Sequence, residues 1–225
     1  MLINDGGVEW LYKFSLKNDP IDIVAAEWAA LEIAYQAGLD VVEHEVTTLA
    51  GQKCLRVKRF DVSSDGGRYY TLTLNSLLKD KETQEDPHQG SYEDIARCLR
   101  YHSDKPVDDC YQLLGQLLIN SELKNVDDHL RNFSVLNDGR GWRLSPAYDI
   151  VSDPSIGNYH QLMLARSEIL PKLDQAEKAV KALGVNKVDA KILVERIRAA
   201  LENWNDLLAE AGASERDIEQ LSRRS

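Results

Sequence analysis

The pattern of apolar residues changes once along the chain, between residues 76 and 90. Before that point, β-branched and aromatic segments alternate apolar with polar side chains, as strands do, around one helical stretch. After it, apolar residues recur at helical spacing. The polar run between the two parts, "SLLKDKETQEDPHQG", is predicted to be a loop or insert. We therefore predict an α+β fold with two lobes, a small mixed lobe over residues 1–75 and a mainly helical lobe over residues 76–225.

The first lobe is predicted to contain one helix among several strands. The helix covers "PIDIVAAEWAALEIAYQAGLD", because Pro20 stands at its start, Ala, Leu and Ile dominate it, and Gly38 follows as a C-terminal glycine. The alternating segment "GGVEWLYKFSLK" before this helix is a predicted strand. Further strands, the second and third forming a hairpin, are predicted in "VVEHEVTTL", "QKCLRVKRFDV" and "RYYTLTLN".

The second lobe is predicted to be built from amphipathic helices. Two of them lie in "SYEDIARCLRYH" and "DDCYQLLGQLLINSELK", the first capped by a serine with an acid three positions later. Residues 186–225 are predicted to form one long amphipathic helix, a break near Gly212 and a short final helix. Residues 155–168 have no pattern that assigns them to a helix or a strand.

The composition argues against several classes of protein. A net charge of −10 does not suit a general nucleic-acid binder, whose surface would be basic. Cys54, Cys98 and Cys110 form no CxxC pair and are odd in number, as expected for reduced thiols. No apolar run is long enough to span a membrane, and the N-terminus lacks the features of a signal peptide. We expect a cytoplasmic protein that contacts neither a membrane nor, directly, a nucleic acid.

Charged residues are concentrated in the stretch "NVDDHLRNFSVLNDGRGWRLSPAYD". Asp127, His129, Arg131 and Asn132 lie close together in a predicted loop. The apolar segments "FSVL" and "WRLS" flank "NDGRG", which predicts a hairpin. Such a hairpin would return Asp149 to the neighbourhood of Asn132.

This combination of residues suits phosphoryl transfer. Asp127 would orient the attacking hydroxyl and take its proton, while Asn132 and Asp149 would hold Mg²⁺. Lys13 on the first strand would neutralise nucleotide phosphates, and Glu27 on the following helix would fix that lysine. The spacing from Asp127 to Asn132 is the Asp-to-Asn spacing of the protein-kinase pattern H-R-D-x-x-x-x-N.

Each of these residues also has an ordinary structural explanation. A D-x-x-x-x-N match arises by chance, Asp127 and Asp128 could cap a turn, and Asn132 could adopt a left-handed conformation. Asp149 could cap a helix, and Lys13 could be a surface lysine. His129 could be a hydrogen-bonded structural residue. The functional interpretation therefore depends on the residues occurring together, in the right order and on suitable elements.

The same stretch resembles the catalytic core of HipA-type serine/threonine kinases, the toxins of HipBA-like toxin–antitoxin pairs. "NVDDHLRN" matches the family pattern N-x-D-x-H-x-[KR]-N, and "SPAYD" matches S-P-x-Y-D, both in full. Outside this core, "LYKF" resembles the strand of the ATP lysine and "AAEWAALEIAYQAGLDV" resembles a family helix. "LRVKRFD" resembles the R-F-D hinge, and "HQGSYEDIARCL" stands where the family has H-Q-E-D-x-x-Q-x-L. The resemblance runs from about residue 8 to residue 165.

The resemblance implies a protein-kinase-like fold and transfer of phosphate from ATP, with Mg²⁺, to a Ser or Thr of a protein. Aminoacyl-tRNA synthetases and translation factors are the implied substrates. Asp127 would be the catalytic base, Asn132 and Asp149 the Mg²⁺ ligands, and Lys13 the ligand of the ATP phosphates. His129 would belong to the catalytic loop and reach a phosphate.

The resemblance also implies where the nucleoside would lie and which parts of the family pattern differ. Main-chain groups from Lys58 to Phe60 would meet the adenine edge, with Asp61 near the ribose. Lys58 stands where the family has an acid. Too few residues precede Lys13 for the family's N-terminal β-rich subdomain and its Gly-rich loop. The implied partners are a HipB-like antitoxin, a small subunit that supplies the missing subdomain, or both.

Two other classes of function remain open at this point. The chain could be an impaired fragment or subunit of a split toxin that acts as a binding module for an antitoxin or partner subunit. It could also be a small-molecule or lipid kinase, because phosphoinositide kinases use a similar D-R-H-x-x-N loop. The S-P-x-Y-D motif, in place of one like D-F-G, argues against the lipid kinase.

Overall fold

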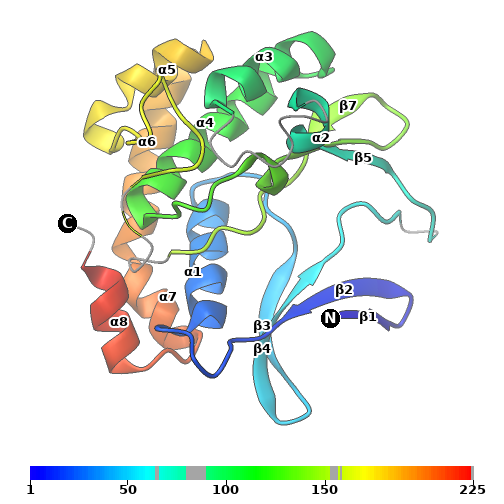
Figure 1. Ribbon diagram of the computed structural model, residues 1–225, viewed down its shortest axis with the longest axis vertical. Helices are drawn as coiled ribbons and strands as arrows, with labels where there is room; N and C mark the ends of the chain where they lie inside the picture. Colours follow the sequence, from blue (N-terminus) through cyan, green and yellow to red (C-terminus); the bar gives the residue numbers. More distant parts are fainter. Residues whose placement is uncertain (64–65, 80–89, 153–156, 158, 224–225) are drawn as a thin grey trace.

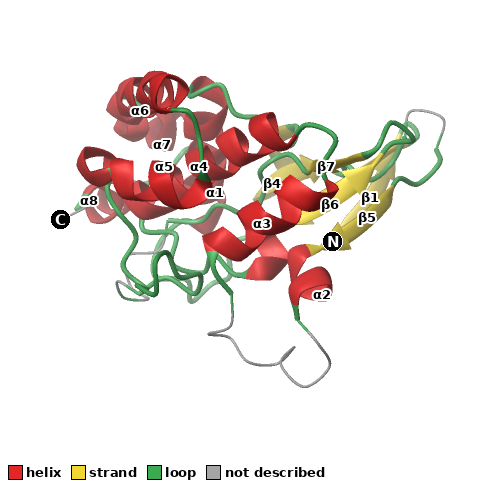
Figure 2. Ribbon diagram, turned by 90° about the horizontal axis from the view of Figure 1, so that it is seen from above, coloured by secondary structure: helices red, strands yellow, loops and turns green. Residues whose placement is uncertain are grey.

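The computed structural model describes residues 1–63, 66–79, 90–152, 157 and 159–223. In this part of the chain, the strands gather toward one side of the molecule and most of the helices toward the other (Figures 1 and 2). Most of the loop predicted over residues 76–90 lies outside the described residues, as do His88 and Gln89 of the family-like segment.

The first sheet contains four antiparallel strands in the order β1-β2-β4-β3. The strand predicted after the glycine pair is β2 (Val8–Lys13), and the glycines turn the chain back from a preceding strand, β1 (Leu2–Asp5), that was not predicted. Gly6 and Gly7 have φ values of 61° and 92°, which glycine adopts without the steric cost of a Cβ. The turn aligns β2 so that Lys13, at its end, pairs with Leu55.

A second hairpin in this sheet joins β3 (His44–Leu49) to β4 (Gln52–Lys58) through Ala50 and Gly51. The next strand, β5 (Tyr70–Thr73), leaves this sheet and pairs with β6 (Ser134–Asn137). The bridge between Val62 and Arg68, together with the hydrogen bond from the Tyr69 N–H to the Asp61 carbonyl at 2.9 Å, links the segments on either side of residue 66. The chain then enters a short helix, α2 (Leu74–Leu78), which takes up the last two residues of the predicted strand and the start of the segment predicted to be a loop.

The second sheet has the order β5-β6-β7, and its hairpin confirms the turn predicted at "NDGRG". In this hairpin, β6 runs antiparallel to β7 (Trp142–Leu144), with Val135 opposite Leu144. Because β5 precedes residue 75 and β6 follows it, this sheet connects the two segments that the sequence assigns to separate lobes. The boundary at residue 75 stays a prediction.

The helix predicted over residues 20–40 is α1 (Ile23–Gln36), and it is the centre of the packing. Asp22 caps its start and Gly38, with φ 85°, follows its end. One face packs on β3 and β4, and other faces contact α4, α6 and α7. The alanines along this helix are completely buried. Their small side chains let the neighbouring elements approach the helix closely on several sides. Glu27, only 2% exposed, is a buried acid among them.

Most of the remaining helices pack on α1 or on helices that contact it. The two predicted helices of the second lobe are α3 (Tyr92–His102), capped by Ser91 as predicted, and α4 (Pro106–Leu123). Two short 3-10 helices, η1 (Leu130–Asn132) and η2 (Leu173–Gln175), and the helix α5 (Glu177–Leu183) were not predicted. The described helices include none that is both long and apolar enough to cross a membrane.

The single long helix predicted after residue 186 is wrong. The chain forms α6 (Lys187–Glu202), turns at Asn203, and continues as α7 (Trp204–Glu210). The turn lets Trp204 enter the core, where it is 1% exposed, and the Asn203 amide donates to Gln36 Oε1 at 2.8 Å. The predicted break near Gly212 is confirmed, and α8 (Glu215–Ser222) follows it. Tertiary packing at one tryptophan thus overrides a continuous helical pattern.

Candidate active site

A lysine and two carboxylates from three distant segments meet at the junction between the first sheet and α1. Lys13 Nζ, at the end of β2, lies 2.6 Å from Glu27 Oε1 on α1. The same nitrogen lies 2.5 Å from Asp149 Oδ1, which follows the β6–β7 hairpin. The structure therefore brings together three of the predicted site residues.

The charges of this triad follow from burial and from each other. Burial raises the pKa of Glu27 to about 7; Lys13 opposes this shift and the negative Asp149 adds to it. Burial lowers the pKa of the Lys13 ammonium, but the two carboxylates outweigh burial, so that its pKa is raised overall. Lys13 stays protonated at neutral pH and is shared between two acids.

Asp149 is held by the residue before it. The Tyr148 hydroxyl donates to the Arg131 carbonyl at 2.9 Å and accepts from Ser134 Oγ at 2.7 Å. Burial raises the Tyr148 pKa to about 12, so this hydroxyl keeps its proton. Asp149 itself has φ 58°, a left-handed conformation that is uncommon outside glycine and that clusters at functional sites.

The predicted catalytic loop lies beside this hairpin. Asn132, in η1, donates its side-chain amide to the Asp127 carbonyl at 2.9 Å, which closes the loop on itself. The Asp127 carboxylate is 57% exposed, and His129 Nε2 lies 3.9 Å from its Oδ1. Burial raises the pKa of Asp127; His129 lowers it, and Asp149 and Asp128 add to the rise. The loop thus presents an accessible carboxylate at its surface.

The oxygen atoms needed for a hard cation are present. The Asn132 amide nitrogen donates to the Asp127 carbonyl, and within the described residues no hydrogen bond is made by the Asn132 amide oxygen. Asp149 uses Oδ1 for Lys13, and Oδ2 has no partner in the described part of the chain. No group of three or more His, Cys, Asp or Glu side chains there could hold a metal. One carboxylate and one amide still suit Mg²⁺, which takes its other ligands from phosphate and water.

One buried nitrogen in the loop suits a phosphate oxygen. His129 Nδ1 is buried and has no hydrogen-bond partner within the part of the chain that the structure describes. A buried polar atom of this kind is costly unless a ligand or water satisfies it. The donor set of this site therefore fits a nucleotide with its metal.

The residues predicted to lie near the nucleoside do not all adjoin the triad. Phe60 stacks on Tyr148, with ring centroids 5.4 Å apart, and so adjoins the Asp149 segment. Lys58 Nζ instead pairs with Glu43 Oε2 at 2.7 Å, and the Lys58 N–H donates to the Glu43 carbonyl. Arg59 donates two hydrogen bonds to the Asp61 carboxylate, and these bonds help to lower the pKa of Asp61. The structure does not connect Lys58 or Asp61 to the triad.

Sequence reasoning missed two residues of this region. Asp128 is fully buried, and its carboxylate accepts from the Tyr92 hydroxyl at 2.7 Å. Gln161, in a segment that no pattern could assign, donates its side-chain amide to Asp127 Oδ1 at 2.5 Å. The doubled aspartate in "VDDH" is the only signal in the sequence that could have pointed to Asp128.

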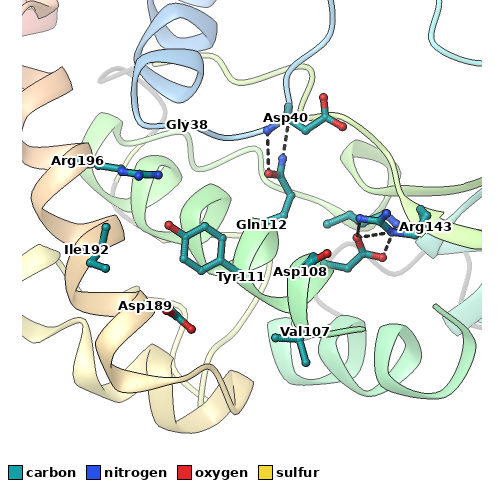
Figure 3. A pocket seen from close by; sticks show the side chains of 12 residues that line it. Gly38, Asp40, Val107, Asp108, Tyr111, Gln112, Arg143, Asp189, Ile192 and Arg196 are labelled. Carbon is teal, nitrogen blue, oxygen red and sulfur yellow. Dashed lines mark hydrogen bonds and ion pairs between the residues drawn. The ribbon is translucent and has the colours of Figure 1, made fainter. Parts of the chain in front are cut away.

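A hollow of about 480 Å³ lies between the end of α1, α4 and α6, away from these residues (Figure 3). Gln112 lines this hollow. Its side-chain oxygen accepts from the Asp40 N–H, and its side-chain nitrogen donates to the Asp40 carbonyl. Arg143 is held on Asp109, and no predicted site residue lines the hollow within the described chain.

Comparison with known proteins decides the family. The family model of the HipA-like C-terminal domain matches residues 2–204. The chain belongs to this family. Two curated relatives are named kinases: "Putative kinase Y4mE" of Sinorhizobium fredii, 27% identical over 189 residues, and a "Putative kinase" of Haemophilus influenzae, 26% identical over 172 residues. These alignments cover 81% and 71% of this chain but 44% and 49% of the relatives, so this HipA-like chain spans about half their length.

Solved structures establish the fold. HipA of Shewanella oneidensis, determined with HipB and operator DNA, superposes with a TM-score of 0.69 at 16% identity, covering 96% of this chain and 55% of HipA. The kinase CtkA of Helicobacter pylori superposes with a TM-score of 0.58 at 14% identity, covering 97% of this chain and 94% of CtkA. The predicted α+β, kinase-like fold is confirmed.

Proposed function

We propose that the chain is the catalytic part of an ATP- and Mg²⁺-dependent serine/threonine protein kinase. The observation that carries this proposal is Lys13 Nζ between Glu27 Oε1 and Asp149 Oδ1, at 2.6 and 2.5 Å. In kinases, a strand lysine fixed by a helix glutamate holds the nucleotide phosphates, and a nearby aspartate holds the metal. A lysine shared by two acids has no comparable role in a module that only docks a partner.

The charge balance of the triad supports a metal–phosphate ligand. One ammonium faces two carboxylates, so the triad has an excess of negative charge whenever Glu27 is ionised. Asn132 and Asp149 would hold Mg²⁺, which supplies electrostatic stabilisation of the transferred phosphoryl group. Lys13 would then turn from Asp149 toward the phosphates. His129 Nδ1, which is buried and has no hydrogen-bond partner within the described residues, would bind a phosphate oxygen there.

Asp127 is the residue best placed to act on the acceptor. Its carboxylate is 57% exposed, in a loop whose main chain is fixed by Asn132. It would orient the acceptor hydroxyl and receive its proton as the bond to phosphorus forms. The raised pKa of Asp127 makes it a better proton acceptor than an ordinary aspartate.

The substrate and partners are proposed from the family. The acceptor would be a Ser or Thr of a protein such as an aminoacyl-tRNA synthetase or a translation factor. Because Shewanella HipA forms a complex with HipB, we propose a HipB-like antitoxin as one partner. A small subunit that completes the front lobe would be another, since the chain spans about half of its relatives.

The test is phosphoryl transfer from radiolabelled ATP with Mg²⁺ to a panel of aminoacyl-tRNA synthetases, alone and with the antitoxin or small subunit added. We expect labelled phosphoserine or phosphothreonine, and a loss of about 10²–10⁴-fold in Asp127→Asn. Asp138→Asn, in the β6–β7 turn, is the matched control and should retain transfer. Transfer that is equal in wild type and Asp127→Asn would refute the assigned base. Antitoxin binding with no ATP binding under any condition would favour the docking module.

A further inference from the structure

The aspartate next to the candidate base is an internal anchor. Asp128 is completely buried, and its Oδ2 accepts from the Tyr92 hydroxyl at 2.7 Å. That hydroxyl accepts in turn from the Asn120 amide at 3.0 Å, and His160 Nδ1 lies 3.1 Å from the same carboxylate oxygen. A carboxylate with this many polar neighbours in the core has a fixed position.

The other oxygen of Asp128 holds a distant part of the chain. Its Oδ1 accepts from the main-chain N–H of Gln161 at 3.0 Å and from that of Leu162 at 3.4 Å. The Gln161 N–H also lies 3.2 Å from the Val126 carbonyl. Both of these contacts join Gln161 to the residues immediately around Asp127, so its backbone is fixed relative to the catalytic loop.

The side chain of Gln161 extends from this fixed backbone to the candidate base. Its Nε2 donates to Asp127 Oδ1 at 2.5 Å. Within the described residues, this is the one side-chain hydrogen bond to the Asp127 carboxylate, and Oδ2 is without a partner. The amide donor therefore occupies one oxygen of this 57% exposed carboxylate and leaves the other oxygen unbonded within the described residues.

We propose that Gln161 is a positioning residue that fixes the rotamer of Asp127, so that Oδ2 is directed at the acceptor hydroxyl. This inference rests on the proposed kinase function. A neutral amide suits the role, because it donates to an ionised carboxylate without adding a second base. Asp128 acts one step further back, because it sets the position of the Gln161 main chain.

The first readout is chemistry. ADP formation from ATP with Mg²⁺, and ATP affinity by calorimetry, would be compared in wild type, Gln161→Met and the control Gln175→Met on the exposed η2. Methionine keeps the length of the side chain and removes the donor. We expect Gln161→Met to lower kcat about tenfold with ATP affinity unchanged, as for the loss of one hydrogen bond to a charged group. Unchanged kcat, or a kcat that rises because the amide had been blocking the base, would overturn the proposal.

The second readout does not depend on activity. Three-bond couplings about χ1 of Asp127, measured by NMR on labelled protein, report whether one rotamer is populated. We expect one rotamer in wild type and Gln175→Met and rotamer averaging in Gln161→Met. Averaging already present in wild type, or a single rotamer in Gln161→Met, would overturn the proposal. An inactive wild type with a single, Gln161-dependent rotamer would instead refute only the kinase function.

Discussion

Glu27 is a buried acid whose ionisation opposes folding, so its neutral replacement should stabilise the protein in a pH-dependent way. It is 2% exposed, and its one hydrogen-bond partner in the described chain, Lys13, is shared with Asp149. Burial raises its pKa from 4.5 to about 7. A raised pKa means that the folded state binds a proton more tightly than the unfolded state. The stability from this proton is complete below pH 4.5 and is lost as pH rises to 7.

The magnitude follows from this shift. Each pKa unit corresponds to about 1.36 kcal/mol, so the pKa change from 4.5 to about 7 predicts a loss of about 2–3 kcal/mol between pH 5 and pH 8. Glu27→Gln keeps the shape of the side chain and removes its titration. The free energy of unfolding of the variant, minus that of wild type, should therefore rise by about 2–3 kcal/mol over the same interval.

Urea unfolding at pH 5, 6, 7 and 8 would measure this difference. Glu202→Gln, on the exposed face of α6, is the matched control for loss of one negative charge and should show no such rise. In thermal unfolding, the rise would appear as a melting temperature about 5–10 °C higher at pH 8 relative to wild type. A difference that is constant with pH, or that shrinks as pH rises, would refute the assignment of burial as the dominant effect on Glu27.

Two further predictions concern stability. Asp109→Ala should lower the free energy of unfolding by about 3–5 kcal/mol, because Arg143 binds this 2% exposed carboxylate at 2.8 and 3.0 Å and would lose its partner. Urea unfolding would measure this beside the control Asp108→Ala at the exposed neighbouring position. Equal free energies of unfolding in the two variants would contradict the prediction. Gly141→Ala should cost more than Gly139→Ala. Both glycines have positive φ, but only at Gly141 would an added Cβ also displace a side chain, that of Asp104, whose carboxylate oxygen lies 1.1 Å from the Cβ position. Equal melting temperatures would contradict this.

The features that sequence predicted best are those encoded locally. The turn "NDGRG" between two apolar segments specified the β6–β7 hairpin, and the hairpin returned the Asp149 segment to the predicted catalytic loop through Tyr148. Gly38 and the dense alanines specified α1 and its end. The meeting of Lys13 with Asp149, 136 positions away, followed only from the order of motifs in a known family.

What sequence missed depends on contacts between distant residues. The bonds from Asp128 to Tyr92 and to Gln161 span 36 and 33 positions, and no spacing rule connects them. The pairing of β5 with β6 crosses the predicted lobe boundary for the same reason. The turn at Asn203 is set by the place of Trp204 in the core, and the spacing of apolar residues along a helix does not reveal that place.

The central claim is that Lys13, Asn132 and Asp149 form a nucleotide–metal site. Titration of ATP by calorimetry, with and without Mg²⁺, would test it in wild type, Asp149→Ala and the control Asp138→Ala, each shown to be folded by circular dichroism. We predict Mg²⁺-dependent ATP binding in wild type and Asp138→Ala, and binding at least tenfold weaker in Asp149→Ala. ATP binding of equal affinity in all three proteins, or binding indifferent to Mg²⁺, would contradict the claim.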